Sequence, residues 1–128
     1  MAENENEALE AAGSGATSAM DALIADCFQI IANVGVAKSS YINAVKLAKE
    51  GKFDEAAQSV ADGDEAFKLG HDVHLGLLQR TAAGEALPFT LILLHAEDQM
   101  AAAETFRVVA GDFIDVHKEL IELKGKLA

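Results

Sequence analysis

A polar group interrupts the most apolar stretch of this 128-residue chain. Residues 91–94 are all apolar, and His95, Glu97, Asp98 and Gln99 follow them directly. If this segment is helical, His95 shares a face with Asp98, three residues on, and with Gln99, four residues on. A neutral imidazole can act as a nucleophile, a general base or a metal ligand. The alternative is that His95 only satisfies a hydrogen bond inside a core.

Asp98 lies on the same helical line as Leu91, Leu94, Ala102 and Thr105. A carboxylate on such an apolar face is costly unless it is paired, protonated or bound to a cation. Because a helix that is apolar on every side is buried on every side, we expect further copies of the chain to cover this face. Identical carboxylates that meet on a symmetry axis repel each other, and a shared divalent cation would relieve that repulsion.

Two more histidines, His71 and His74, lie one helical turn apart earlier in the chain. Since the connection at residues 83–88 is short, we expect the helices on either side of it to be antiparallel, with these histidines near the level of His95. Together with His95 and Asp98 they could form a metal site within one subunit. The sequence contains no Glu-x-x-His unit, which argues against a dinuclear carboxylate bundle.

Composition and periodicity predict an all-α fold. Hydrophobic residues make up 51% of the chain and aromatic residues 5%, with one proline, so the core is built from small and aliphatic side chains that favour helices. Apolar residues recur at three- and four-residue steps, and Pro88 suits the first turn of the last helix. The predicted helices span residues 18–51, 53–84 and 88–128. Residues 1–17 are predicted to be a disordered acidic tail, and residues 18–128 to form an up-down-up antiparallel three-helix bundle.

The charge and the single cysteine exclude several functions. A net charge of −11 argues against binding to nucleic acid or to an anionic membrane surface. Cys27 lies in an apolar run and should pack as a small hydrophobic residue, so the chain has no disulfide framework. The N-terminus lacks the basic segment of a signal peptide, and we expect no helix that inserts into a membrane. These features predict a cytoplasmic protein.

The segment His95-Ala96-Glu97-Asp98-Gln99-Met100 resembles the signature His-(Ala/Gly)-Gln-Asp-His-Leu-Met of a known family. This family contains the lactose/cellobiose (chitobiose)-type IIA components of the bacterial sugar phosphotransferase system. Further similarities cover essentially the whole chain after the predicted tail. They are Gly35-Val36-Ala37-Lys38-Ser39, Gly51-Lys52-Phe53-Asp54-Glu55-Ala56, Gly70-His71-Asp72-Val73-His74 and Gly84-Glu85-Ala86-Leu87-Pro88-Phe89.

The resemblance implies a phosphocarrier that works as a homotrimer of three-helix subunits. The first histidine of the signature, here His95, would accept a phosphoryl group from the phosphocarrier HPr and pass it to a cysteine of the IIB component. The signature aspartate, here Asp98, would meet its copies at the trimer axis around a divalent cation, expected to be Mg²⁺. There is little covalent chemistry for the protein to perform in such a transfer beyond positioning and electrostatics.

Two departures from the family pattern bear on the site. The second signature histidine is Gln99 here, while the glutamine of the second helix is His74. We therefore expect His74 and Gln99 to contact each other or to line one pocket with His71 beside His95. Glu97 replaces a glutamine and adds negative charge, which disfavours phosphorylation. These changes leave open the alternative of a non-catalytic helical scaffold or regulator derived from the same fold.

Overall fold

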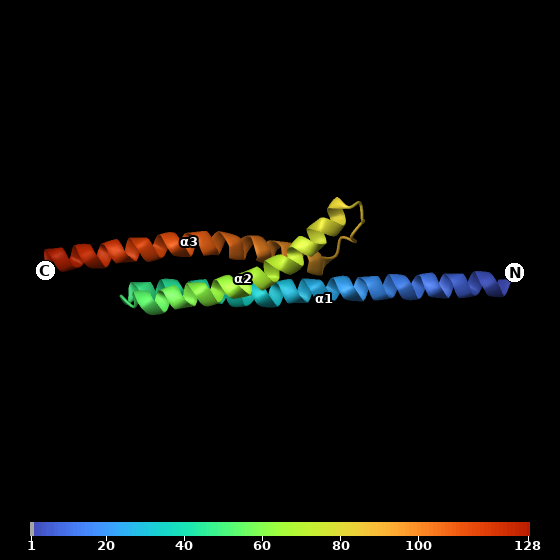
Figure 1. The fold of residues 1–128 in the computed structure, drawn as a ribbon, viewed down its shortest axis with the longest axis horizontal. Coiled ribbons are helices and arrows are strands. Elements are labelled where there is room, and N and C mark those ends of the chain that lie inside the picture. The colour runs from blue at the N-terminus through green and yellow to red at the C-terminus, as the bar shows by residue number, and fades with distance from the viewer. Residues whose placement is uncertain (1) are drawn as a thin grey trace.

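The computed structural model describes residues 2–128, apart from the side chains of residues 2, 3, 16 and 17. Its three helices are α1 (Ala2–Lys49), α2 (Phe53–Ala82) and α3 (Leu91–Leu127), and no strand occurs between residues 2 and 128. α2 runs back along α1, and α3 returns in the direction of α1 (Figure 1). The predicted all-α, up-down-up arrangement is therefore confirmed for the single chain.

The turn after α1 is set by Gly51. Its φ of +80° lies in the left-handed region that glycine adopts at no steric cost. The backbone amides of Gly51 and Lys52 donate to the carbonyl oxygens of Ala48 and Leu47, both at 2.9 Å, which closes the end of the helix. α2 begins directly afterwards, at Phe53, as the sequence predicted.

The predicted start of the third helix at Pro88 is wrong. Pro88 belongs to the connection after α2, and α3 begins at Leu91. Thr90 is the N-cap: its backbone is extended, with φ −121° and ψ 157°, and its hydroxyl oxygen accepts a hydrogen bond from the amide of Leu93 at 3.3 Å. A threonine in this position satisfies an amide that the first turn of a helix leaves without a partner, so the helix starts after Thr90 rather than at Pro88.

The core is centred on α1, because α2 and α3 pack chiefly against α1 and touch each other least. The largest fully buried side chains all come from this helix. They are Tyr41, Leu23, Ile30, Val34 and Cys27. The expectation that Cys27 packs as a small hydrophobic residue is confirmed.

Two glycines bring α2 close to α1. A Cβ atom added at Gly63 would lie 2.7 Å from Cε1 of Tyr41, and one added at Gly70 would lie 2.8 Å from Cγ1 of Val34. Gly63 and Gly70 are seven residues apart, as are Val34 and Tyr41 on the facing helix. The antiparallel register of α1 and α2 therefore depends on two matched contacts of a glycine with a large side chain.

The predicted tail at residues 1–17 is drawn from Ala2 onward as the beginning of α1, and this part of the helix projects past α2 and α3 (Figure 1). Alanine and glutamate favour helix formation, so local propensity is enough to extend the helix into this segment. Residues 4–15 are exposed and gain no tertiary packing. The disorder of this tail in solution stays a prediction, and Met1 lies outside the described residues.

One described helix is long and apolar enough to cross a membrane by length and composition. It is the stretch Asn4–Lys49 of α1, where the sequence pattern predicted no membrane-spanning helix. However, Leu23, Ile30 and Val34 within it are at most 1% exposed, because they pack in the centre of the bundle. The place of these residues in the core explains part of the apolar character of α1.

Candidate functional site

His95 stands near the beginning of α3, where its neighbours fix its orientation. Leu93 and Ala96 are buried, and these two residues anchor one side of the helix in the core. His95 itself is exposed, so it does not satisfy a hydrogen bond inside the core. Among the described residues its imidazole has no hydrogen bond or ion pair. The ring is thus presented to solvent on a rigid helix, with its nitrogens open to a reactant.

Asp98 lies one turn after His95 and is also exposed. The residues that precede it on the same line, Leu91 and Leu94, are 84% and 53% exposed. No hydrogen bond or ion pair of the Asp98 carboxylate occurs within the described part of the chain. The single chain therefore leaves open the apolar face that the sequence assigned to contact with further copies.

His74 pairs with Glu97 rather than with Gln99. The N–H at Nε2 of His74 donates to Oε1 of Glu97 across 2.6 Å, joining α2 to α3. Residues 97 and 99 are two positions apart and point to nearly opposite sides of the helix, so a side chain that meets Glu97 from α2 is turned away from Gln99. The same spacing separates Glu97 from His95. The extra carboxylate is therefore held on the α2 side of α3, away from the face of the exposed histidine.

A second polar contact ties α3 to α2 ten residues later in α3 and ten residues earlier in α2. Oδ1 of Asp64 accepts hydrogen bonds from the hydroxyl of Tyr41 at 2.7 Å and from Nε of Arg107 at 2.9 Å, so it links all three helices. The Arg107 guanidinium also lies 5.3 Å from the centroid of the Phe67 ring. Together with the contact of His74, this network fixes the register of α3.

His71 lies one turn before His74 and is exposed. Its ring stacks on Phe67, with the centroids 5.9 Å apart and an angle of 26° between the planes. It lines an open hollow between α2 and α3 that Arg107 and Glu104 also line. His71 is thus accessible, but no hydrogen bond connects it to His95 within the described residues.

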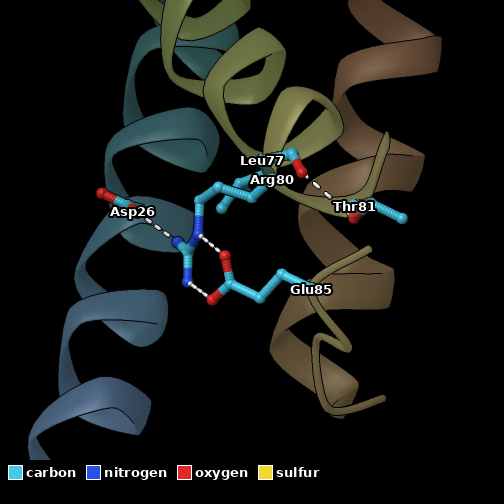
Figure 2. A network of polar contacts seen from close by, with 5 residues as sticks. All are labelled: Asp26, Leu77, Arg80, Thr81 and Glu85. Atoms are coloured by element: carbon cyan, nitrogen blue, oxygen red, sulfur yellow. Dashed lines mark hydrogen bonds and ion pairs between the residues drawn. The ribbon is translucent and has the colours of Figure 1, made fainter. Parts of the chain in front are cut away.

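The connection before α3 is held by a small ionic network (Figure 2). Nε and Nη2 of Arg80 donate to the two carboxylate oxygens of Glu85 at 2.8 and 2.7 Å, and Nη1 lies 3.8 Å from Asp26 on α1. The guanidinium holds the pKa of the Glu85 carboxyl below its usual value. At the end of α2, the hydroxyl of Thr81 donates to the carbonyl of Leu77 at 3.1 Å. This network anchors the chain just before the helix that carries His95.

The metal site within one subunit does not form. Across the described residues, no group of three or more His, Cys, Asp or Glu side chains is arranged to hold a metal ion. His74 is engaged with Glu97, and Asp98 lies on an exposed face of α3.

The arrangement has a counterpart among known proteins. The family described as the lactose/cellobiose-specific IIA subunit of the phosphotransferase system matches residues 25–118. The chain belongs to this family. The matched range includes His71, His74, His95, Asp98 and Gln99, and it leaves out the beginning of α1 and the last ten residues.

Individual relatives of this chain are also IIA components of sugar phosphotransferase systems. It is 34% identical to the oligo-beta-mannoside-specific EIIA component of Bacillus subtilis, over 71% of this chain and 83% of the relative. It is 36% identical to the galactose-specific EIIA component of Lactococcus lactis subsp. cremoris, over 76% of this chain and 84% of the relative. The crystal structure of the cellobiose-specific enzyme IIA from Bacillus anthracis superimposes with a TM-score of 0.74 at 35% identity, covering 76% of this chain and 89% of that one. The chain is thus a transferase component of a sugar phosphotransferase system.

Proposed function

We propose that this IIA chain carries a phosphoryl group on His95, which it accepts from HPr and passes to a cysteine of the IIB component. The observation that carries the proposal is the state of His95: it is exposed, it has no partner among the described residues, and it occupies the signature position. A neutral imidazole nitrogen attacks the phosphorus as the bond to the nitrogen of the donor histidine breaks. The cysteine thiolate then attacks the same phosphorus, and the imidazole leaves.

The surroundings of His95 suit a carrier that must serve two partners in turn. Both partners need access to the same nitrogen, and the exposed start of α3 allows this. The contact between His74 and Glu97 keeps the nearest extra carboxylate on another side of the helix. We assign Gln99, which shares a face of α3 with His95, to the lining of the site around the transferred group. His74 is held by Glu97 on the other side of α3, and His71 lies one turn before His74 on α2, so neither is assigned to this lining. We place the reaction in the cytoplasm, where the chain works with HPr and IIB.

We also propose that the chain acts as a homotrimer around a divalent cation. Leu91 and Leu94 are exposed in the single chain, and Asp98 continues their face. Three copies placed with this face inward would bring three Asp98 carboxylates together. Carboxylate oxygens are the ligands that Mg²⁺ prefers, so the donor set fits a cation that offsets their mutual repulsion.

The test is intact-mass analysis after incubation with phosphoenolpyruvate, the general phosphotransferase enzyme and HPr. We expect the wild-type chain to gain one acid-labile, alkali-stable phosphoryl group and the His95→Ala variant to gain none. His117→Ala is the matched control, because it removes a histidine further along the same helix and should leave the gain intact. If a folded wild-type chain gains no phosphoryl group, the carrier proposal falls and a non-catalytic helical scaffold takes its place.

A further inference from the structure

One of the two aromatic side chains of α1 is exposed. Tyr41 is fully buried, whereas the side chain of Phe28 is 59% exposed. Among the described residues, the Phe28 ring takes part in no aromatic or cation–π contact. An aromatic ring buries a large apolar area when a partner covers it, so its position relative to His95 decides what it can do.

Phe28 lies opposite His95 across the groove between α1 and α3. Further along the two helices, Ile42 of α1 and Val109 of α3 line one apolar hollow. Phe28 and His95 precede these two residues by fourteen positions each, which is close to four whole turns of a helix. Because α1 and α3 run in the same direction (Figure 1), the earlier pair has the same relation as the later one, about 21 Å nearer the beginning of α3.

The core contacts at this level agree with that placement. Cys27 and Ala96, the direct neighbours of the pair in the sequence, are buried in the same hydrophobic cluster. Burial raises the pKa of the Cys27 thiol and the charge of Glu97 contributes to the shift, so the beginning of α3 lies close to Cys27. One step forward from Cys27 and one step back from Ala96 turn to the same side of two parallel helices. Phe28 and His95 are therefore exposed on one flank of α1 and α3.

The parts of α1 and α3 that carry this pair are acidic. Lys38 is the first basic residue of the chain, and six acidic residues precede it. On α3, the acidic residues Glu97, Asp98 and Glu104 come before the first basic residue, Arg107. A donor that arrives with a negatively charged phosphoryl group is repelled by such a face unless its own contact surface is basic. The partner that fits here presents an apolar side chain surrounded by basic residues.

We propose that Phe28 is a docking residue for the phosphoryl donor, and that its ring packs against an apolar side chain of the donor beside His95. This inference rests on the proposed carrier role of His95 and deepens it by naming a residue of another helix that positions the donor. A ring that a partner covers contributes to binding and takes no part in the bond that is exchanged. Phe28 therefore determines how tightly the donor binds, while the transfer step belongs to His95.

The kinetics of transfer test this role. Phosphoryl transfer from phosphorylated HPr to the chain is followed by quenched intact-mass analysis over a range of HPr concentrations. Phe28→Ala should raise the half-saturating concentration of phosphorylated HPr about tenfold and leave the maximal rate within about twofold of the wild type. Phe28→Leu, which keeps an apolar side chain, should recover most of the affinity. Val36→Ala is the matched control, because it shortens a similarly exposed residue, at 57%, about two turns further along the same helix.

The salt dependence of the same reaction tests the charge of the donor's contact surface. Raising the KCl concentration from about 50 mM to about 300 mM should increase the half-saturating concentration by the same factor in the wild type and in Phe28→Ala. The reason is that salt screens the charges of the acidic face and leaves the apolar contact unchanged. A half-saturating concentration that does not depend on salt would refute a basic partner surface.

The outcomes separate docking from the carrier role on which it rests. A wild-type chain that gains no phosphoryl group refutes the carrier role itself. If the wild type is phosphorylated and Phe28→Ala behaves like Val36→Ala, or loses maximal rate rather than affinity, the docking role is wrong and the carrier role stands. The docking role is also wrong if Phe28→Ala weakens the association of copies of the chain in sedimentation while Val36→Ala does not, because a second copy then covers the ring.

Discussion

Nε2 of His74 lies 2.6 Å from Oε1 of Glu97, and this contact joins α2 to α3 two residues from the exposed His95. The His74 side chain is 13% exposed and the Glu97 side chain 46% exposed, so the pair lies half in water. Pairs in such a position contribute at most about 1 kcal/mol to stability because water screens them. The main consequence is orientation, since the contact holds the Glu97 carboxylate on the α2 side of α3.

A double-mutant cycle measures this contact. We expect His74→Ala and Glu97→Ala to show a coupling energy of about 0.5–1 kcal/mol in the free energy of unfolding, measured by urea denaturation. The control cycle uses Lys68 and Asp72, whose side chains lie 2.7 Å apart on one turn of α2 and are both largely exposed. That pair should couple by about 0.3–0.5 kcal/mol. Additive effects of the two changes at His74 and Glu97 would show that the contact is absent in solution.

The glycines of α2 give a second prediction, about packing. Gly63→Ala and Gly70→Ala should each lower the free energy of unfolding by about 1–3 kcal/mol, because the new methyl group meets Tyr41 or Val34 in a filled core. Gly76→Ala on the same helix is the matched control, since nothing lies within 4 Å of a Cβ added there. That change should raise stability by about 0.5–1 kcal/mol, because alanine loses less backbone entropy than glycine.

Thermal or urea unfolding of the three glycine variants measures whether their stabilities fall in the predicted order, with Gly76→Ala above the other two. A destabilising Gly76→Ala would show that the loss comes from the helix itself rather than from the contact between α1 and α2. Neutral changes at both Gly63 and Gly70 would show that the two helices are further apart than the structure places them.

Tyr41 predicts how stability depends on alkaline pH. Burial, followed by the hydrogen bond to Asp64 and the charge of that carboxylate, raises the pKa of the Tyr41 hydroxyl well above its ordinary value of 10.0. The folded chain thus keeps the proton while the unfolded chain releases it. The stability that this residue contributes is fully present below pH 10 and is lost as the pH rises from there towards the folded pKa.

The measurement is direct because the chain has one tyrosine and no tryptophan. The near-ultraviolet absorbance of tyrosinate therefore reports on Tyr41 alone, and we expect it to rise only as the helices unfold, followed in parallel by circular dichroism. Tyr41→Phe should lose less stability between neutral and alkaline pH than the wild type. Tyrosinate absorbance at its ordinary pKa in a chain that is still helical would contradict the prediction.

The sequence was sufficient to predict the parts of the fold that local patterns determine. Apolar residues at three- and four-residue steps define each helix, and Gly51 marks the turn after α1 because only glycine adopts its backbone conformation easily. The polar residues that follow residues 91–94 indicated a functional role for His95, because nothing in the local sequence pattern requires a histidine at this position of an apolar helix. The start of α3 was misplaced because Pro88 and Thr90 are both common at helix starts, and the sequence does not say which is used.

The long-range contacts could not be predicted in the same way. Asp64 and Arg107 are 43 residues apart, and nothing in the spacing of either residue names the other as its partner. Gly63 and Gly70 look like weak points of a helix until the facing side chains of α1 are known. The antiparallel arrangement of α2 and α3 correctly placed His74 at the level of the site, but which side of α3 it meets depends on the rotation of that helix. The spacing of apolar residues along α3 determines this rotation only to within about one residue position.

The last prediction concerns Asp98 and the proposed cation. If three Asp98 carboxylates meet on the trimer axis, removing divalent cations leaves them to repel each other, and the assembly should dissociate more readily in EDTA. Adding Mg²⁺ at about 100 times its dissociation constant should restore about 2.7 kcal/mol of stability to the assembly.

Asp98→Asn removes both the repulsion and the charge that attracts the cation, so the variant should respond to neither reagent. Asp115→Asn, at an exposed position of α3 off this face, is the control and should behave like the wild type. The readout is the thermal midpoint together with sedimentation in EDTA and in Mg²⁺. A wild-type assembly that is indifferent to both would show that no cation holds the axis, while leaving the role of His95 intact.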